Sequence, residues 1–140
     1  MILENLRLMV SFSQKEVEFL NKMEECRVAT SHGNIPHVKP VSFLYEEGVI
    51  WIATDYETRM YKNLLENPRA AASIDIYKDK GHQAVCLQGD VTIIENGAEF
   101  ARIYKKFQER FQWVRDQAWE ENEAPFVKIT PKTKTSWGLE

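Results

Sequence analysis

A short stretch near the middle of the chain combines residues that suit an anion. From Ile50 to Ala53 the residues alternate as in a β-strand, and the chain then becomes polar at Thr54. Thr58 is placed to cap a short helix, and Arg59 and Lys62 lie in its first turns. A helix N-terminus offers unpaired N–H groups and partial positive charge, so a phosphate is the natural ligand. The alternative interpretation is a capped surface helix whose cations are solvated.

Strand and helix patterns along the rest of the chain predict a small α+β domain. Ser13 and Glu16 form a capping box for a helix that continues to about residue 24, and Asn67-Pro68 ends the central helix. Asn96, helped by Glu99, is expected to cap a helix over 97–115. The predicted strands, separated by turn residues, cover 26–31, 36–45, 48–54, 70–77, 83–94, 126–129 and 133–137. Six or seven short antiparallel strands with flanking helices indicate a barrel, because closure removes exposed edges.

Several short motifs occur in an order that is informative as a set. They are "RVAT" at 27–30, "P-V-S-F" at 40–43, "T-R-x-x-K-N-L-x-x-N-P-R" at 58–69, "V-x-L-x-G-x-V" at 85–91, and "I-T-P-K…S-W-G" at the end. In order and spacing they resemble the pyridoxamine 5′-phosphate oxidase-like family of FMN-binding split barrels. The resemblance runs from about residue 15 to the C-terminus. It implies an antiparallel split β-barrel of six to seven strands.

The resemblance also implies where a cofactor would bind. Arg59, Lys62 and the hydroxyls of Thr54 and Thr58 would serve the FMN phosphate. In the family the second strand lies along the flavin ring, and that strand contains Lys39, Pro40, Val41 and Ser42 here. Proline cannot donate to a ladder, so Pro40 points either to a free strand edge or simply to a local end of pairing. Trp137 resembles a tryptophan that approaches the flavin from the neighbouring chain in relatives, although it is equally a common type of core residue.

One residue departs from the family pattern, which usually has a lysine directly after the arginine. Here that position is Met60, and Lys62 follows two residues later. A deazaflavin therefore stays open as an alternative to FMN. Haem also stays open, through the turn histidines His32, His37 and His82.

No acid–base pair identifies a reaction, so the catalytic residues are unknown. Flavin chemistry does not require such a pair, because the cofactor carries hydride and electrons. The first hypothesis is an FMN-dependent oxidoreductase acting on an unidentified small molecule. The second is a non-catalytic flavin-, deazaflavin- or haem-binding module, and the third is a dimeric structural protein whose groove holds no cofactor.

Composition limits the other classes of function. The 140 residues, with 44% apolar and 28% charged, predict one domain over 1–140. A net charge of −3 and a pI near 5.7 argue against a nucleic-acid partner. No apolar run could span a membrane, and Glu4 and Arg7 interrupt the N-terminal apolar stretch, so we expect a cytoplasmic protein. Cys26 and Cys86 are expected to be free thiols, and no motif predicts a metal site.

The helix over 97–115 is unusually rich in aromatic residues. Its apolar positions are Phe100, Ile103, Tyr104, Phe107, Phe111 and Val114. This face would pack either against a second copy of the chain or inside the chain's own core. Because members of the resembling family form dimers with the flavin at the interface, we expect a homodimer.

Overall fold

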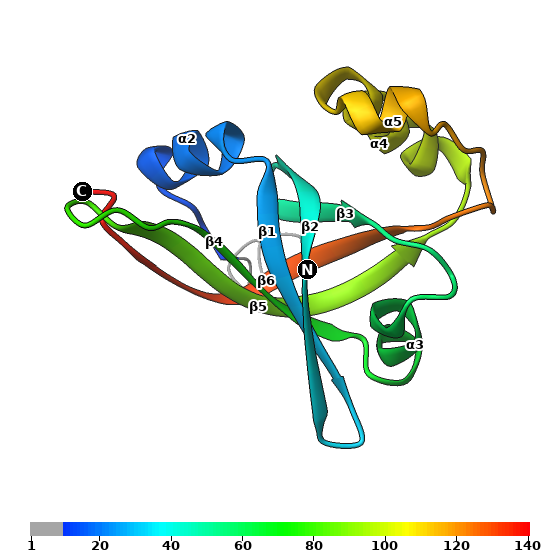
Figure 1. Cartoon of the computed structure of the whole chain (residues 1–140), viewed down its shortest axis with the longest axis horizontal. Helices are drawn as coiled ribbons and strands as arrows, with labels where there is room; N and C mark the ends of the chain where they lie inside the picture. The colour runs from blue at the N-terminus through cyan, green and yellow to red at the C-terminus, as the bar shows by residue number, and fades with distance from the viewer. Residues whose placement is uncertain (1–9) are drawn as a thin grey trace, which may run out of the picture.

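A computed structural model of the chain describes residues 10–140 (Figure 1). The N-terminal prediction from Glu4 and Arg7 lies outside these residues. Within residues 10–140, no helix is both long enough and apolar enough to cross a membrane.

Within residues 10–140, six strands form the barrel and four helices flank it. The helices are α2 (Gln14–Lys22), α3 (Arg59–Glu66), α4 (Gly97–Arg110) and α5 (Gln112–Asp116). The strands are β1 (Glu25–His32), β2 (Ile35–Glu46), β3 (Val49–Ala53), β4 (Arg69–Ile76), β5 (Gln83–Ile94) and β6 (Phe126–Trp137). All neighbouring strands are antiparallel, and the sheet closes in the order β1-β2-β3-β6-β5-β4. The predicted α+β antiparallel barrel is therefore confirmed.

The two predicted hairpin turns form because their residues tolerate positive φ. Gly33 and Asn34 have φ of 57° and 64° and join β1 to β2. Glu47 and Gly48 have φ of 47° and 83° and join β2 to β3. Two successive residues with positive φ match the right-handed twist of the flanking strands. The β1–β2 hairpin projects away from the rest of the barrel (Figure 1).

The C-terminal part of the sheet corrects one prediction. The two strands expected over 126–129 and 133–137 are a single 12-residue strand, β6. It continues through Pro131 because the register with β5 shifts between Gln88 and Gly89, which leaves an irregularity that a proline can occupy. A Cβ on Gly89 would lie 2.2 Å from the Thr130 carbonyl oxygen, so this crossing requires glycine.

Apolar side chains gather in two clusters. The barrel interior contains Phe43, Ile50, Ile52 and Met60, among others. A second cluster lies outside the barrel, where α4, α5 and the residue between them cover Trp51 and Phe126. From this helical segment it contains Phe100, Ile103, Phe107, Phe111 and Val114. The aromatic face of the predicted helix is thus buried within the chain, and it no longer provides a reason to expect a dimer.

The helix ends agree only partly with the expected capping. Ser13 and Glu16 form the predicted capping box at the start of α2. Asn96 stands at the start of α4, but its side chain makes no capping bond; the Gly97 N–H donates to Glu121 instead, at 2.8 Å. The helix predicted over 97–115 breaks at Phe111, whose extended backbone separates α4 from α5.

Candidate functional site

A pair of threonine hydroxyls marks the junction between β3 and α3. The Thr54 and Thr58 Oγ1 atoms lie 2.8 Å apart. The Thr58 hydroxyl also donates to the Asp55 carbonyl and accepts from the Tyr61 N–H, at 3.0 and 3.1 Å. Thr58 therefore caps α3 as predicted, and this capping occupies much of its hydrogen-bonding capacity. Thr54 is buried, and its N–H donates to the Pro125 carbonyl at 3.3 Å.

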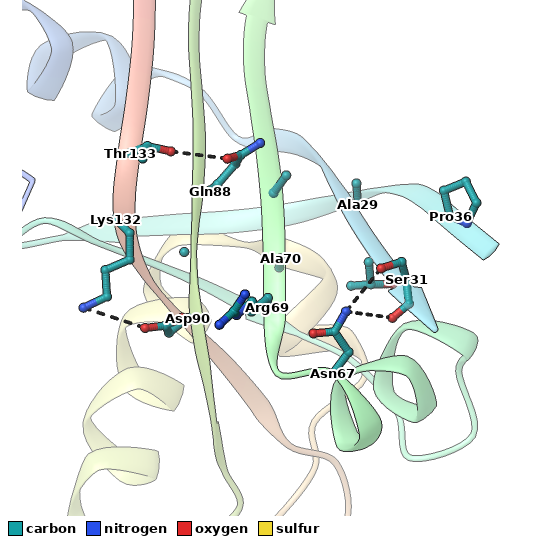
Figure 2. A pocket seen from close by; sticks show the side chains of 13 residues that line it. Ala29, Ser31, Pro36, Asn67, Arg69, Ala70, Gln88, Asp90, Lys132 and Thr133 are labelled. Atoms are coloured by element: carbon teal, nitrogen blue, oxygen red, sulfur yellow. Dashed lines mark hydrogen bonds and ion pairs between the residues drawn. The ribbon is translucent and has the colours of Figure 1, made fainter. Parts of the chain in front are cut away.

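Two asparagines of the "N-L-x-x-N-P" motif hold α3 against the end of β1. The buried Asn63 Nδ2 donates to Thr30 Oγ1 at 3.1 Å. One turn later, Asn67 Nδ2 donates to both the carbonyl and the hydroxyl of Ser31, each at 3.2 Å (Figure 2). These residues were not among the predicted site residues. Their four-residue spacing places both on one face of a helix, which was the available signal.

The cations of α3 lie on its outer face. Arg59 and Lys62 are exposed and are three residues apart, so their side chains are neighbours on the helix surface. The first intrahelical hydrogen bond of α3 runs from the Lys62 N–H to the Thr58 carbonyl. The N–H groups that precede it in the chain therefore point out of the helix end. The first-turn N–H groups and the two cations therefore lie at the exposed start of α3, whereas the Thr54 hydroxyl is buried.

Met60 has a different role from the one that its position in the motif suggests. Its side chain is 0% exposed and belongs to the barrel core. It faces away from the surface that Arg59 and Lys62 share. A lysine placed here would enter an apolar core, so adding a cation at position 60 would not simply restore a phosphate contact.

The predicted ring-binding strand has one unpaired edge beside this junction. β2 pairs with β1 from Ile35 to Ser42, and with β3 only from Phe43 to Glu46. Lys39, Pro40, Val41 and Ser42 therefore extend past the end of β3, and the edge that Pro40 indicated is present. The Ser42 hydroxyl accepts from the Trp113 indole N–H at 3.1 Å.

Trp137 lies far from this group. Thr54 is beside the start of β6, through Pro125, whereas Trp137 is the last residue of that 12-residue strand. At about 3.3 Å per residue, the two ends of β6 are roughly 35 Å apart. Thr54, Thr58, Arg59 and Lys62 therefore lie toward one end of β6 and Trp137 at the other, while Pro40 on β2 lies directly beside Arg27 on β1.

Nearby acidic and phenolic groups set the electrostatics of the β3–α3 junction. Asp55 and Glu57 are exposed carboxylates in the connecting loop, and they reduce the local positive charge. Burial and a hydrogen bond to Glu95 raise the pKa of Tyr56 to about 12, so this phenol stays neutral. The Tyr56 and Tyr61 rings meet edge to face, 5.0 Å apart.

A separate hollow lies on the outer face of the sheet. Its volume is about 610 Å³, and short side chains such as Ala29 and Ala71 form its floor. Around it, Lys132 and Asp90 pair at 3.7 Å and Gln88 accepts from Thr133 at 3.4 Å (Figure 2). None of the nine predicted cofactor-binding residues lines this hollow. We place the candidate site at the β3–α3 junction because the hydroxyls, cations and free strand edge meet there.

The thiols and histidines give no second reactive centre. Cys26 and Cys86 are free, as expected, and burial raises the pKa of the Cys26 thiol to about 12. Within residues 10–140, no group of three histidine, cysteine or acidic side chains is arranged to hold a metal. His82 makes two side-chain contacts, one with Asp75 and one with Trp137.

A closed six-stranded antiparallel barrel with a hydroxyl- and cation-bearing junction after its third strand defines a split-barrel protein. A sequence profile described as pyridoxamine 5′-phosphate oxidase matches residues 12–138. The chain belongs to this family, which confirms the resemblance. No curated protein matches the sequence.

Solved structures with the same fold differ widely in sequence. A conserved hypothetical protein from Mycobacterium tuberculosis has a TM-score of 0.76 and 22% identity, over 91% of this chain and 86% of that one. The heme storage protein HutZ from Vibrio cholerae has a TM-score of 0.76 and 13% identity, over 91% and 94%. An FAD-binding protein from Mesorhizobium loti has a TM-score of 0.71 and 17% identity, over 89% and 94%. At these identities the similarity shows the fold alone.

Proposed function

We propose that the chain is an FMN-binding oxidoreductase that acts on a small organic molecule as a homodimer. The observation that carries the proposal is the convergence at the start of α3. There, the hydroxyls of Thr54 and Thr58 lie 2.8 Å apart beside the exposed Arg59 and Lys62. The Thr58 hydroxyl donates to the Asp55 carbonyl, and the Thr54 hydroxyl then donates to Thr58. The charge-assisted bonds to a phosphate dianion would therefore come from Arg59, Lys62 and the N–H groups at the helix start.

The neighbouring strand supports a flavin over a smaller phosphate. A flavin ring needs a flat apolar bed and hydrogen bonds at its polar edge. Pro40 offers exposed apolar surface, and the unpaired edge of β2 offers backbone groups. When bound, FMN would supply the redox chemistry. The protein would hold its phosphate with Arg59 and Lys62 and its ring along residues 39–42.

The separation of Trp137 from α3 supports the proposed homodimer. With the ends of β6 roughly 35 Å apart, one chain cannot bring Trp137 to its own α3. A second copy could supply it. Ile35 and Val38 on the projecting hairpin are 72% and 65% exposed, which gives apolar surface for such a contact.

The alternative is a non-catalytic module that holds a flavin, a deazaflavin or haem. The relative HutZ, described as a heme storage protein, is one reason to keep haem. A second is the His37 Nδ1 atom, which is buried without a partner among the described residues. The absorption spectrum of the purified protein distinguishes the cofactors: flavin bands support an FMN site, and a Soret band overturns it in favour of haem.

Titration of FMN fluorescence tests the placement of the phosphate. Arg59→Ala should weaken FMN binding about tenfold or more, because a charge-assisted contact contributes ~1.5–3 kcal/mol. The matched control is Lys105→Ala, which removes an exposed cation from α4. Riboflavin, which lacks the phosphate, should bind the Arg59→Ala variant and the parent equally.

Two results would contradict this arrangement. Unchanged FMN affinity in Arg59→Ala would remove the phosphate from the start of α3. A protein that sediments as a 16.4 kDa monomer and still binds FMN tightly would contradict the shared site.

A further inference from the structure

A polar cluster lies at the end of β6, far from α3. Its members are Arg27 on β1, Asp75 on β4, His82 just before β5, and Trp137 at the end of β6. We refer to these four residues as the β5–β6 tip. Of the first three, only His82 was considered from the sequence, as a candidate haem ligand, and only the closed sheet brings them together.

Hydrogen bonds connect the four side chains in series. Arg27 Nη1 lies 3.1 Å from Asp75 Oδ1. The other carboxylate oxygen, Asp75 Oδ2, lies 3.4 Å from His82 Nε2. Finally, the Trp137 indole N–H donates to His82 Nδ1 at 3.5 Å. The His82 and Trp137 rings also meet edge to face, with their centroids 5.8 Å apart.

The donors in this series determine where the His82 proton must be. An indole N–H can only donate, so Nδ1 of His82 must be the acceptor. The proton of a neutral imidazole then resides on Nε2, where it can be donated to Asp75. A second proton on His82 would have to sit on Nδ1. That N–H would then face the indole N–H, so two donors would repel each other, while the ion pair between His82 and Asp75 would become stronger.

The backbone around these rings is closely packed. Gly138 has a φ of 75°, and a Cβ there would lie 2.2 Å from the His82 carbonyl oxygen. Gln83 Nε2 also donates to the Gly138 carbonyl at 3.1 Å. These contacts fix the end of β6 against the start of β5. The Trp137 side chain, 41% exposed, is the freer part.

We propose that His82 and Asp75 are positioning residues for Trp137. Neutral His82 holds the indole through Nδ1, and uptake of one proton from solvent by His82 releases it. Histidine is the side chain suited to such a change between pH 5 and 8. The proposal rests on the proposed function where it concerns flavin: the tryptophan that this proton controls is the one that a second copy would present to the cofactor.

Other groups near His82 act on the same equilibrium. Asp75 favours the imidazolium, and Arg27 opposes it by sharing the carboxylate. The Tyr77 ring packs edge to face on His82 with centroids 5.3 Å apart. The remaining charged residues of the adjoining segments are Lys78, Asp79 and Lys80 in the turn before His82, and Glu140 after Trp137.

Side-chain NMR of the ¹⁵N-labelled protein, without cofactor, tests the positioning. At pH 8, His82 should be the neutral tautomer with its proton on Nε2. Between pH 8 and 5.5, the Trp137 indole N–H resonance should shift in step with His82. Trp113 is the internal control: it is similarly exposed, at 37%, but its indole donates to the Ser42 hydroxyl, which does not titrate.

Two variants make the result specific. In His82→Gln the acceptor can be retained but titration is lost, so the Trp137 resonance should stay constant with pH. In Asp75→Asn the Trp137 resonance should respond to pH differently from the parent, because the carboxylate no longer pairs with His82. A Trp137 resonance that does not respond to pH, or that titrates equally in His82→Gln, would overturn the proposal.

FMN titrations separate this proposal from the proposed function. If both hold, FMN affinity falls on acidification from pH 8 to 5.5, and the fall is smaller in His82→Gln. If NMR shows the expected titration while FMN does not bind, the proton-controlled tryptophan stands and the flavin function fails. If FMN binds and Trp137 does not titrate, the flavin function stands and the positioning role fails.

Discussion

At the α3 end of the barrel, buried neutral groups fix the backbone, whereas at the β5–β6 tip the partners are charged and partly exposed. Asn63 reaches Thr30 inside the protein, and Met60 fills the core beneath. At the tip, Arg27 and His82 share the Asp75 carboxylate beside solvent. Buried neutral contacts are insensitive to pH, and exposed ion pairs contribute little stability but respond to protons. We infer that one end is built to be rigid and the other to be adjustable.

The strongest test of this contrast exchanges the two types of residue within α3. Met60→Lys should lower the free energy of unfolding by about 3 kcal/mol or more, because it places an ammonium group in the barrel core. Lys62→Met, the reverse change on the exposed face, should alter it by less than ~0.5 kcal/mol. Urea unfolding of both variants measures the difference. Equal effects would show that α3 has no rigid inner face.

Asn63→Ala should be the next largest change. It removes a buried donor and leaves the Thr30 hydroxyl without its partner, which should cost about 2 kcal/mol. Asn67→Ala, at a half-buried position one turn later, is the matched control and should cost about half as much. Thermal unfolding can rank the two. A larger loss of stability for Asn67→Ala would mean that the contact at the end of α3 holds the helix more strongly than the buried contact of Asn63.

Glu16 is the exception on the tip side, because its carboxylate is buried and bonded to Lys134 on β6. Burial alone would raise its pKa, but hydrogen bonds from Lys134, Ser136 and the Ser13 N–H outweigh this and hold the pKa at about 2. Since the folded pKa lies below the ordinary value of 4.5, the stability contribution is present above pH 4.5. It is lost as the pH falls toward 2.

Glu16→Gln tests this contribution. The variant should be less stable than the parent by about 2 kcal/mol at pH 7, and the gap should shrink steadily between pH 4.5 and 2. Glu18→Gln, an exposed change on the same helix, should show no such pH dependence. Parallel denaturant curves that keep a constant gap down to pH 2 would show that the ion pair does not stabilise α2.

The smallest effect is expected at the tip itself. Asp75→Asn removes the exposed pair with Arg27 and should change the free energy of unfolding by less than ~1 kcal/mol at pH 7. Calorimetry near neutral pH provides the measurement. A loss of several kcal/mol would show that the β5–β6 tip stabilises the fold substantially, and it would weaken the contrast with α3.

Local patterns in the sequence were sufficient for most of the fold. The glycine-containing turns, the Ser13 capping box and the Thr58 cap depend on residues close together in the chain, so their signals can be read directly. Pro131 was misread as a break, because the bulge that accommodates it depends on Gly89, more than forty residues earlier. The burial of the aromatic face of α4 depends on Trp51 in the same way.

The candidate site was predictable only in part. Residues from Thr54 to Lys62 and the edge of β2 lie next to each other because consecutive strands pair. The burial of Met60 could not be read from its motif, since which helical positions face the core depends on how α3 packs. The partners of Trp137 were missed because Asp75 and His82 reach it only after the sheet closes.

Barrel closure also has a consequence for the order of folding. β1, β2 and β3 form a meander joined by tight turns, whereas β3 pairs with β6 across a long separation, as between Ile50 and Ile129. Contacts between residues so distant in sequence form slowly, because the loop must close before it gains any interaction. We therefore expect the meander to form early and β6 to dock last. Until β6 has emerged from the ribosome and docked, the edges of β3 and β5 stay open to wrong partners.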